Sequence, residues 1–177
     1  MPLPEALARR ARAIRLLVLD VDGVLTDGRL YYSSAGNESK TFHIQDGLGI
    51  KLLQRSGVRV ALITGRRSPV VERRARELGI DLMFQGVEDK LGTFGQLLRE
   101  LGLEADHAGC MGDDLPDLPL IRRCALGVTV PDAPEVVRQH AHHVTRRRGG
   151  EGAVREVCDL VMAAQGTLAD ALRDYLA

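Results

Sequence analysis

The sequence has few aromatic residues and no tryptophan: three Phe and three Tyr occur in 177 residues. A hydrophobic core of this chain must therefore be built from Leu, Val, Ile and Ala. No charge of either sign is in excess, because 24 basic residues balance 24 acidic ones. This balance provides no electrostatic attraction to nucleic acid or to an anionic membrane surface, and we expect neither as a partner.

Cysteine is also scarce. The three cysteines, Cys110, Cys124 and Cys158, are far apart, odd in number and form no C-x-x-C pair. This pattern indicates reduced thiols and a cytoplasmic location, and it disfavours a structural zinc site. No apolar run approaches the roughly 18 residues that a membrane span requires, and the first residues lack the apolar region of a signal peptide.

Short apolar runs alternate with amphipathic stretches along the chain. Continuous apolar runs of strand length predict parallel strands that are covered on both faces. Helical patterns lie between them, and several end at a glycine such as Gly79 or Gly102. Strand, helix, strand in repetition predicts an α/β fold: a doubly wound, Rossmann-like three-layer sandwich with a parallel sheet, as a single domain over residues 1–177.

One segment departs from this alternation. Residues 29–44 indicate a protruding β-hairpin, with β-prone residues at 30–32 and 41–44 around a turn at 35–38.

Polar and charged residues follow the apolar runs at the points where the predicted strands end. In open α/β sheets, ligands bind at the carboxyl ends of the strands, so these side chains should share one rim. They are Asp20 and Asp22, then Thr64, Gly65 and Arg66, then Lys90, and finally Asp113, Asp114 and Asp117. Carboxylates gathered at one rim repel one another unless a cation neutralises them, and hard oxygen ligands suit Mg²⁺.

Each of these residues has a predicted role. Asp20 ends its strand and can attack phosphorus to form an aspartyl-phosphate, while Asp22 can donate and accept the protons. Thr64 and Lys90 hold the phosphoryl oxygens. Asp113 binds the metal, with Asp114 as its expected companion.

Five positions keep an alternative. Asp114 could bind the metal or cap the next helix. Asp117 could serve the site or cap a helix, and Arg66 could contact the substrate or form a surface salt bridge. Asp46 with Gly47 could face the substrate, or Asp46 could cap its own helix.

The set Asp20-Val-Asp22-Gly-Val, Thr64-Gly-Arg66, Lys90 and Gly112-Asp113-Asp114 resembles the four motifs of the haloacid dehalogenase phosphatase superfamily, in the same order. The resemblance implies that Asp20 is the nucleophile and Asp22 the acid/base, whose backbone carbonyl also ligates Mg²⁺. The implied metal ligands are therefore Asp20, Asp22 and Asp113.

Longer stretches, such as Gln45-Asp46-Gly47 and 152–159, resemble the 3-deoxy-D-manno-octulosonate 8-phosphate phosphatases. This similarity implies a cytoplasmic tetramer that hydrolyses a sugar-acid phosphate in lipopolysaccharide biosynthesis. A phosphatase of a related sialic-acid-type sugar phosphate, a non-catalytic oligomeric module of the same fold and a phosphotransferase are the alternatives.

Many superfamily members carry a cap domain between the first and second motifs or between the second and third. Here neither interval has room for a domain. We therefore expect a neighbouring subunit to cover the cleft, with the hairpins of several subunits pairing through their exposed edges in a central barrel or sheet.

Overall fold

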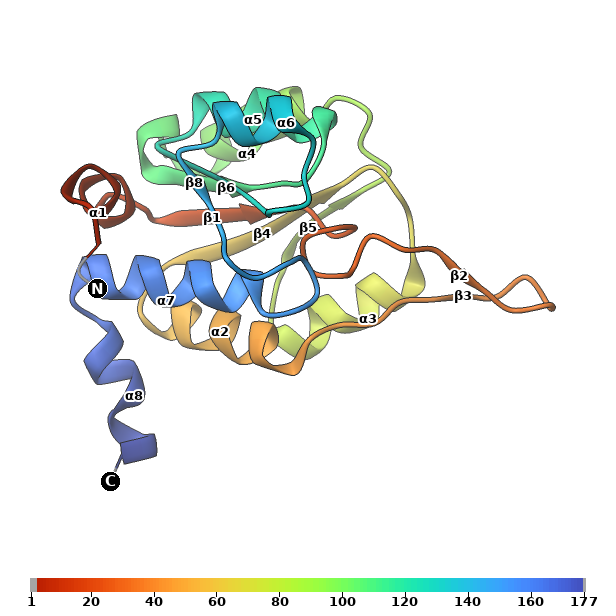
Figure 1. Cartoon of the computed structure of the whole chain (residues 1–177), viewed down its shortest axis with the longest axis horizontal. Helices are drawn as coiled ribbons and strands as arrows, with labels where there is room; N and C mark the ends of the chain where they lie inside the picture. Colours follow the sequence, from red (N-terminus) through yellow and green to blue (C-terminus); the bar gives the residue numbers. More distant parts are fainter. Residues whose placement is uncertain (1–2, 177) are drawn as a thin grey trace.

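The computed structural model describes residues 3–176. Its centre is a sheet of six parallel strands (Figure 1). In spatial order, they are β5 (Leu82–Gln85), β4 (Arg59–Thr64), β1 (Leu16–Leu19), β6 (Ala108–Met111), β7 (Leu126–Thr129) and β8 (His143–Val144). The chain order reverses at β1, which pairs with β4 on one side and β6 on the other. This order is that of a doubly wound fold, and it confirms the predicted class.

Helices cover both faces of the sheet (Figure 1). One layer contains α2 (Ile44–Arg55), α3 (Pro69–Leu78) and α7 (Ala153–Gln165); the other contains α4 (Lys90–Leu101), α5 (Leu118–Arg123) and α6 (Glu135–His140). α1 (Glu5–Arg12) lies beside the start of β1, and α8 (Leu168–Leu176) extends away from the body. Two 3-10 turns, η1 (Ala105–His107) and η2 (Leu115–Asp117), flank β6.

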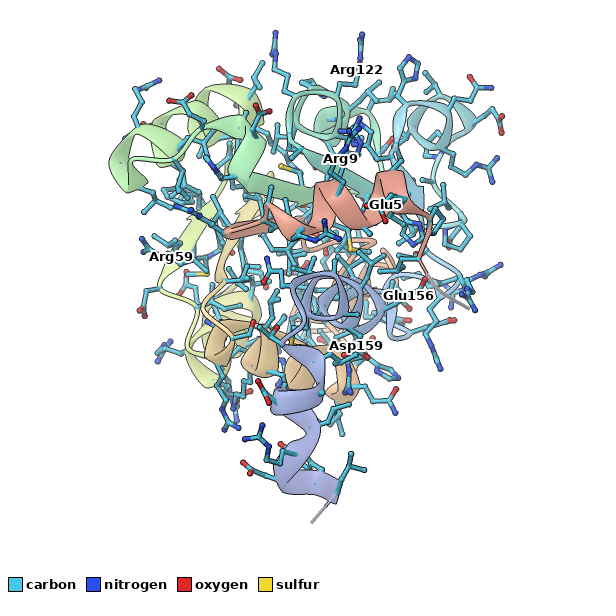
Figure 2. The ribbon with its side chains drawn as sticks, turned by 90° about the vertical axis from the view of Figure 1, so that its left-hand side faces the viewer. Glu5, Arg9, Arg59, Arg122, Glu156 and Asp159 are labelled. Atoms are coloured by element: carbon cyan, nitrogen blue, oxygen red, sulfur yellow. The ribbon has the colours of Figure 1, made fainter. Side chains whose placement is uncertain are left out.

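The pleat of β1 shows why the strands are apolar throughout. Leu17 and Leu19 pack into the core cluster on one face, while Leu16 and Val18 pack into the cluster on the other. Successive side chains of a strand point to opposite faces, so a strand buried on both sides needs an apolar residue at every position. Charged side chains such as Arg9, Arg59 and Arg122 lie on the surface (Figure 2).

The hairpin is shorter than predicted. It consists of β2 (Tyr31–Tyr32) and β3 (Glu38–Ser39), and it projects from the end of the molecule opposite both termini (Figure 1). The prediction of a strand over 41–44 is wrong, because α2 begins at Ile44. Phe42 instead lies against Arg74: the guanidinium carbon of Arg74 is 5.7 Å from the centre of the Phe42 ring.

The intervals that would hold a cap domain are short in the structure. Between β1 and β4 the chain forms the hairpin and α2, and between β4 and Lys90 it forms α3 and β5. Across residues 3–176, no helix has both the length and the apolar character needed to cross a membrane.

Candidate active site

The turn after β1 positions the first two carboxylates. Asp20 directly follows the strand, and its amide donates to the carbonyl of Met111 on β6 at 3.0 Å. The chain then reverses tightly, because the amides of Val24, Leu25 and Thr26 all donate to the carbonyl of Val21. Gly23 adopts a φ of +85° in this turn, a conformation that residues with a Cβ rarely adopt.

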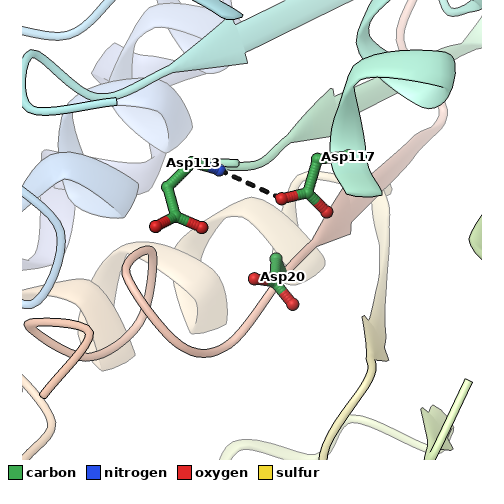
Figure 3. Close-up of side chains that lie close together, drawn as sticks. All are labelled: Asp20, Asp113 and Asp117. Atoms are coloured by element: carbon green, nitrogen blue, oxygen red, sulfur yellow. Dashed lines mark hydrogen bonds between the residues drawn. The ribbon is translucent and has the colours of Figure 1, made fainter. Parts of the chain in front are cut away.

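Three carboxylates from two strand ends meet at the point where the strand order reverses (Figure 3). Oxygen atoms of Asp20, Asp113 and Asp117 lie within 4.8 Å of one another. Asp113 follows β6, and Asp117 ends η2. This set of hard oxygen donors fits a divalent cation such as Mg²⁺.

Lys90 is the cation that the structure itself places among these acids. Its ammonium donates to Asp20 Oδ1 at 2.9 Å and to Asp117 Oδ1 at 2.6 Å, and its side chain is only 6% exposed. It is the first residue of α4, where Asp89 caps the helix by accepting from the Gly92 amide. Although burial alone would lower it, the pKa of Lys90 lies above its usual range because Asp20 and Asp117 flank the ammonium.

Two of the acids are held in an unfavourable environment. Burial, together with the charge of Asp117, raises the pKa of Asp20 to about 7 despite the nearby Lys90. Burial and the charges of Asp20, Asp117 and Asp114 raise the pKa of Asp113 to about 7 as well. One ammonium does not offset the repulsion in this cluster, so a divalent cation would be strongly favoured here.

Asp114 and Asp117 each take one of the roles left open for them: Asp114 caps η2, and Asp117 joins both that cap and the acidic cluster. Asp114 Oδ1 accepts from the Leu115 amide at 2.7 Å, so its carboxylate caps η2. Asp117 turns inward instead: its Oδ2 accepts from the Asp113 amide at 3.1 Å (Figure 3), and its Oδ1 accepts from Lys90. The 3-10 geometry of η2 thus brings the fourth residue after Asp113, and not its neighbour, into the acidic cluster.

The second motif lies beside this cluster. Thr64 ends β4, which runs parallel to β1, and it is buried. Gly65 follows it, and the nearest neighbour of a Cβ added there would be the carbonyl of Val87 at 3.6 Å. Arg66 is 44% exposed in its side chain, and its Nη2 donates to Glu38 Oε1 at 2.9 Å and to the Tyr32 hydroxyl at 3.1 Å.

The carboxylate of Asp22 contacts two cationic side chains, Lys40 of the hairpin and Arg66. Its Oδ1 accepts a short hydrogen bond from Lys40, and its Oδ2 lies 3.7 Å from Arg66 Nε. Sequence analysis did not find Lys40 or Glu38. The one available signal was the rarity of lysine in this arginine-rich chain, which applies to Lys40 as it does to Lys90.

The structure corrects the expectation that Asp46 and Gly47 face the substrate. Asp46 is 1% exposed, and its Oδ1 accepts from the Arg155 amide at 2.7 Å, so it binds the first turn of α7 and does not cap its own helix. Gly47 faces side chains of α3: a Cβ there would lie 2.3 Å from Arg74 Nη2 and 3.1 Å from Leu78 Cδ2. Both residues serve helix packing in this chain.

Comparisons with known proteins agree with this geometry. Residues 80–157 match the haloacid dehalogenase-like hydrolases. The chain is 46% identical to the 3-deoxy-D-manno-octulosonate 8-phosphate phosphatase KdsC of Yersinia pestis, over 94% of this chain and 89% of that protein. It is 45% identical to the protein of the same name from Escherichia coli K12, over 96% and 90% of the two chains.

A solved structure shares the whole fold. The 3-deoxy-D-manno-octulosonate 8-phosphate phosphatase of Moraxella catarrhalis, crystallised with a magnesium ion, a phosphate ion and a KDO molecule, superposes with a TM-score of 0.95. The two sequences are 43% identical, and the alignment covers 99% of this chain and 100% of that one.

The crowded acids predict how Asp113→Asn changes stability. With a pKa raised from 3.8 to about 7, Asp113 stabilises the fold below about pH 4, and this contribution is lost as the pH rises through 7. Without divalent cations, Asp113→Asn should therefore raise the melting temperature by several degrees at pH 8 and by much less at pH 5. Thermal unfolding at both pH values, with and without Mg²⁺, measures this. If the variant were less stable than wild type at pH 8 without Mg²⁺, the claim that the ionised Asp113 carboxylate is destabilised by its surroundings would be wrong.

Gly23 predicts a steric requirement of the same site. A Cβ added there would lie 2.0 Å from Asp113 Oδ2, so Gly23→Ala should displace that carboxylate and abolish most of the rise in melting temperature caused by Mg²⁺. Gly28→Ala is the matched control: Gly28 also has a positive φ, of +76°, but its Cβ would meet only the backbone of Gly23 at 3.3 Å. Equal responses to Mg²⁺ in the two variants would rule out the proposed contact.

Proposed function

The chain belongs to the family of 3-deoxy-D-manno-octulosonate 8-phosphate phosphatases, which are haloacid dehalogenase-like hydrolases, and on this basis we propose that it hydrolyses that ester to the free sugar acid and inorganic phosphate. The observation that carries the proposal is the position of Asp20. Asp20 directly follows β1, and its largely buried carboxylate lies beside the Lys90 ammonium and the Asp113 carboxylate. This arrangement suits a nucleophile that attacks a phosphoryl group held by cations.

The reaction proceeds in two displacements. In the first, a carboxylate oxygen of Asp20 forms a bond to phosphorus while the bond from phosphorus to the sugar oxygen breaks, and Asp22 gives its proton to the leaving alkoxide. In the second, water attacks the aspartyl-phosphate, Asp22 takes the water's proton, and the bond between phosphorus and Asp20 breaks. Inorganic phosphate leaves, and both aspartates return to their initial states.

Mg²⁺ is the cofactor of this reaction. Asp20 and Asp113 would hold it through their carboxylates and Asp22 through its backbone carbonyl, while Asp117 keeps Lys90 and the Asp113 amide in place. When bound, the ion neutralises the charge on the transferring phosphoryl group. Thr64, Gly65 and Lys90 bind the phosphoryl oxygens, and Arg66 at the rim contacts the sugar acid.

The substrate is a small sugar-acid phosphate, and the names of the relatives favour 3-deoxy-D-manno-octulosonate 8-phosphate over a sialic-acid-type sugar phosphate. A role in lipopolysaccharide biosynthesis in the cytoplasm follows from that substrate. A non-catalytic module of the same fold has no need for the nucleophile, the acid/base and the lysine together, so their joint presence favours an enzyme.

A neighbouring subunit completes the cleft in our proposal. Within residues 3–176, β2 and β3 pair only with each other, and the hairpin exposes Leu30, Tyr31 and Tyr32. An exposed hairpin with free edges and apolar side chains is suited to self-association. We propose a homotetramer assembled through the hairpins.

Phosphate release tests the activity. With Mg²⁺, wild type should release phosphate from 3-deoxy-D-manno-octulosonate 8-phosphate faster than from a sialic-acid-type phosphate or a simple ester, and chelation should stop the reaction. Asp20→Asn should lower kcat by about a thousand-fold or more, because the amide cannot form the aspartyl-phosphate. Asp106→Asn, an exposed position at the other end of β6, is the control. An active Asp20→Asn enzyme would refute the mechanism.

Light scattering tests the assembly. Wild type should have the mass of four chains, and Leu30→Glu should dissociate it because a charge would be buried between hairpins. Val136→Glu, on α6, alters an aliphatic side chain of similar exposure, 40% against 49%, and should leave the mass unchanged. A monomeric wild type with full activity on the sugar phosphate would refute the proposal that a neighbouring subunit covers the cleft.

A further inference from the structure

Lys40 lies just after β3, at the base of a hairpin whose other side chains are mostly exposed. Its own side chain is turned inward and is only 1% exposed. A lysine ammonium is rarely buried to this degree unless it is paired, because removal of the charge from water is costly. The partners of Lys40 therefore indicate its role.

Those partners are two carboxylates. The ammonium donates a short hydrogen bond to Asp22 Oδ1 and lies 3.5 Å from Glu38 Oε1. Arg66 closes the set from the other side, because its Nη2 donates to Glu38 Oε1 at 2.9 Å and its Nε lies 3.7 Å from Asp22 Oδ2. Asp22, Lys40, Glu38 and Arg66 thus form a ring of alternating charge, which we call the hairpin ring.

The hairpin ring fixes the carboxylate of Asp22. One of its oxygens is hydrogen-bonded to Lys40, and the other faces Arg66, which is itself bonded to Glu38 and Tyr32. A carboxylate in a loop can otherwise rotate about two side-chain bonds. General acid catalysis requires the proton donor to lie within hydrogen-bond reach of the leaving oxygen, so this restraint bears directly on the rate.

Lys40 has no direct access to a substrate, since its side chain is buried, and it belongs to a different ion pair from Lys90, which contacts Asp20 and Asp117. We propose that Lys40 is a positioning residue that orients the Asp22 carboxylate toward the leaving-group oxygen. The inference rests on the proposed function and assigns to the hairpin, beyond any part in assembly, a role in the proton transfer.

The experiment compares two leaving groups. The alkoxide of a sugar phosphate needs a proton as it departs, whereas the phenolate of p-nitrophenyl phosphate is stable without one. Lys40→Met should lower kcat for 3-deoxy-D-manno-octulosonate 8-phosphate by roughly ten- to a hundred-fold, with KM changed by less than about three-fold. Its kcat for p-nitrophenyl phosphate should stay within about three-fold of wild type.

Two further variants separate this role from a structural one. Lys51→Met changes an exposed lysine on α2 and should leave both substrates unaffected. In an Asp22→Asn background, Lys40→Met should add less than about two-fold to the loss, because the group it orients is already gone. If circular dichroism shows that Lys40→Met does not fold, Lys40→Gln takes its place in every comparison.

Equal losses on the two substrates, or no loss on either, would overturn the inference. So would a Lys40 effect of full size in the Asp22→Asn background. Failure of the proposed function has a different signature, because the wild-type enzyme itself would then release no phosphate from the sugar ester.

Discussion

Repulsion among Asp20, Asp113 and Asp117 is the constraint on which the rest of the site depends. The parallel sheet brings the ends of β1 and β6 together where the strand order reverses, and it thereby forces buried carboxylates into one small volume. Burial and, after it, the neighbouring carboxylates raise the pKa values of Asp20 and Asp113 to about 7, although the ammonium of Lys90 lies beside them. A divalent cation brings the compensating positive charge and can then also bind an anionic phosphoryl group, so the repulsion in the cluster and the chemistry of the site have the same origin.

Small residues make this crowding possible. Gly23 leaves room for the Asp113 carboxylate, and Gly112 does the same for Asp117, since a Cβ there would lie 2.1 Å from the Asp117 Cβ. Neither glycine carries any chemistry. Gly23 permits the close approach of the loops after β1 and β6, and Gly112 permits the tight fold of the loop after β6 onto itself, so that the acids can share a cation.

The hairpin connects assembly and chemistry in one short segment. Its first arm carries the exposed Leu30 and Tyr32, while its second arm carries Glu38 and Lys40, which face Arg66 and Asp22. In a fold without a cap domain, such a segment can influence both what covers the cleft and how the acid/base is oriented. The hydrogen bond from Tyr31 to Asp27, at 2.5 Å, anchors the hairpin to the turn that follows β1.

The fold class and most of the rim could be predicted from the sequence. Continuous apolar runs indicated buried parallel strands, and the residues after each run indicated the rim, because both signals are local in the chain. Which of Asp114 and Asp117 joins the acidic cluster could not be predicted, since it depends on which carboxylate the 3-10 turn η2 directs toward Lys90. Asp46 was misassigned because its partner, the Arg155 amide, lies on a helix more than a hundred residues away. Lys40 was missed for a similar reason: the burial of its side chain depends on contacts made in the folded chain, including that with Asp22, eighteen residues away.

The sequence by itself determined the alternation of strands and helices, the set of acidic residues and the family, because pattern and motif spacing are properties of the chain. Tertiary structure alone decided which carboxylates converge, which lysine faces which acid and which polar residues serve packing. Those outcomes depend on distances between segments remote in sequence, and electrostatic interactions follow distance in space.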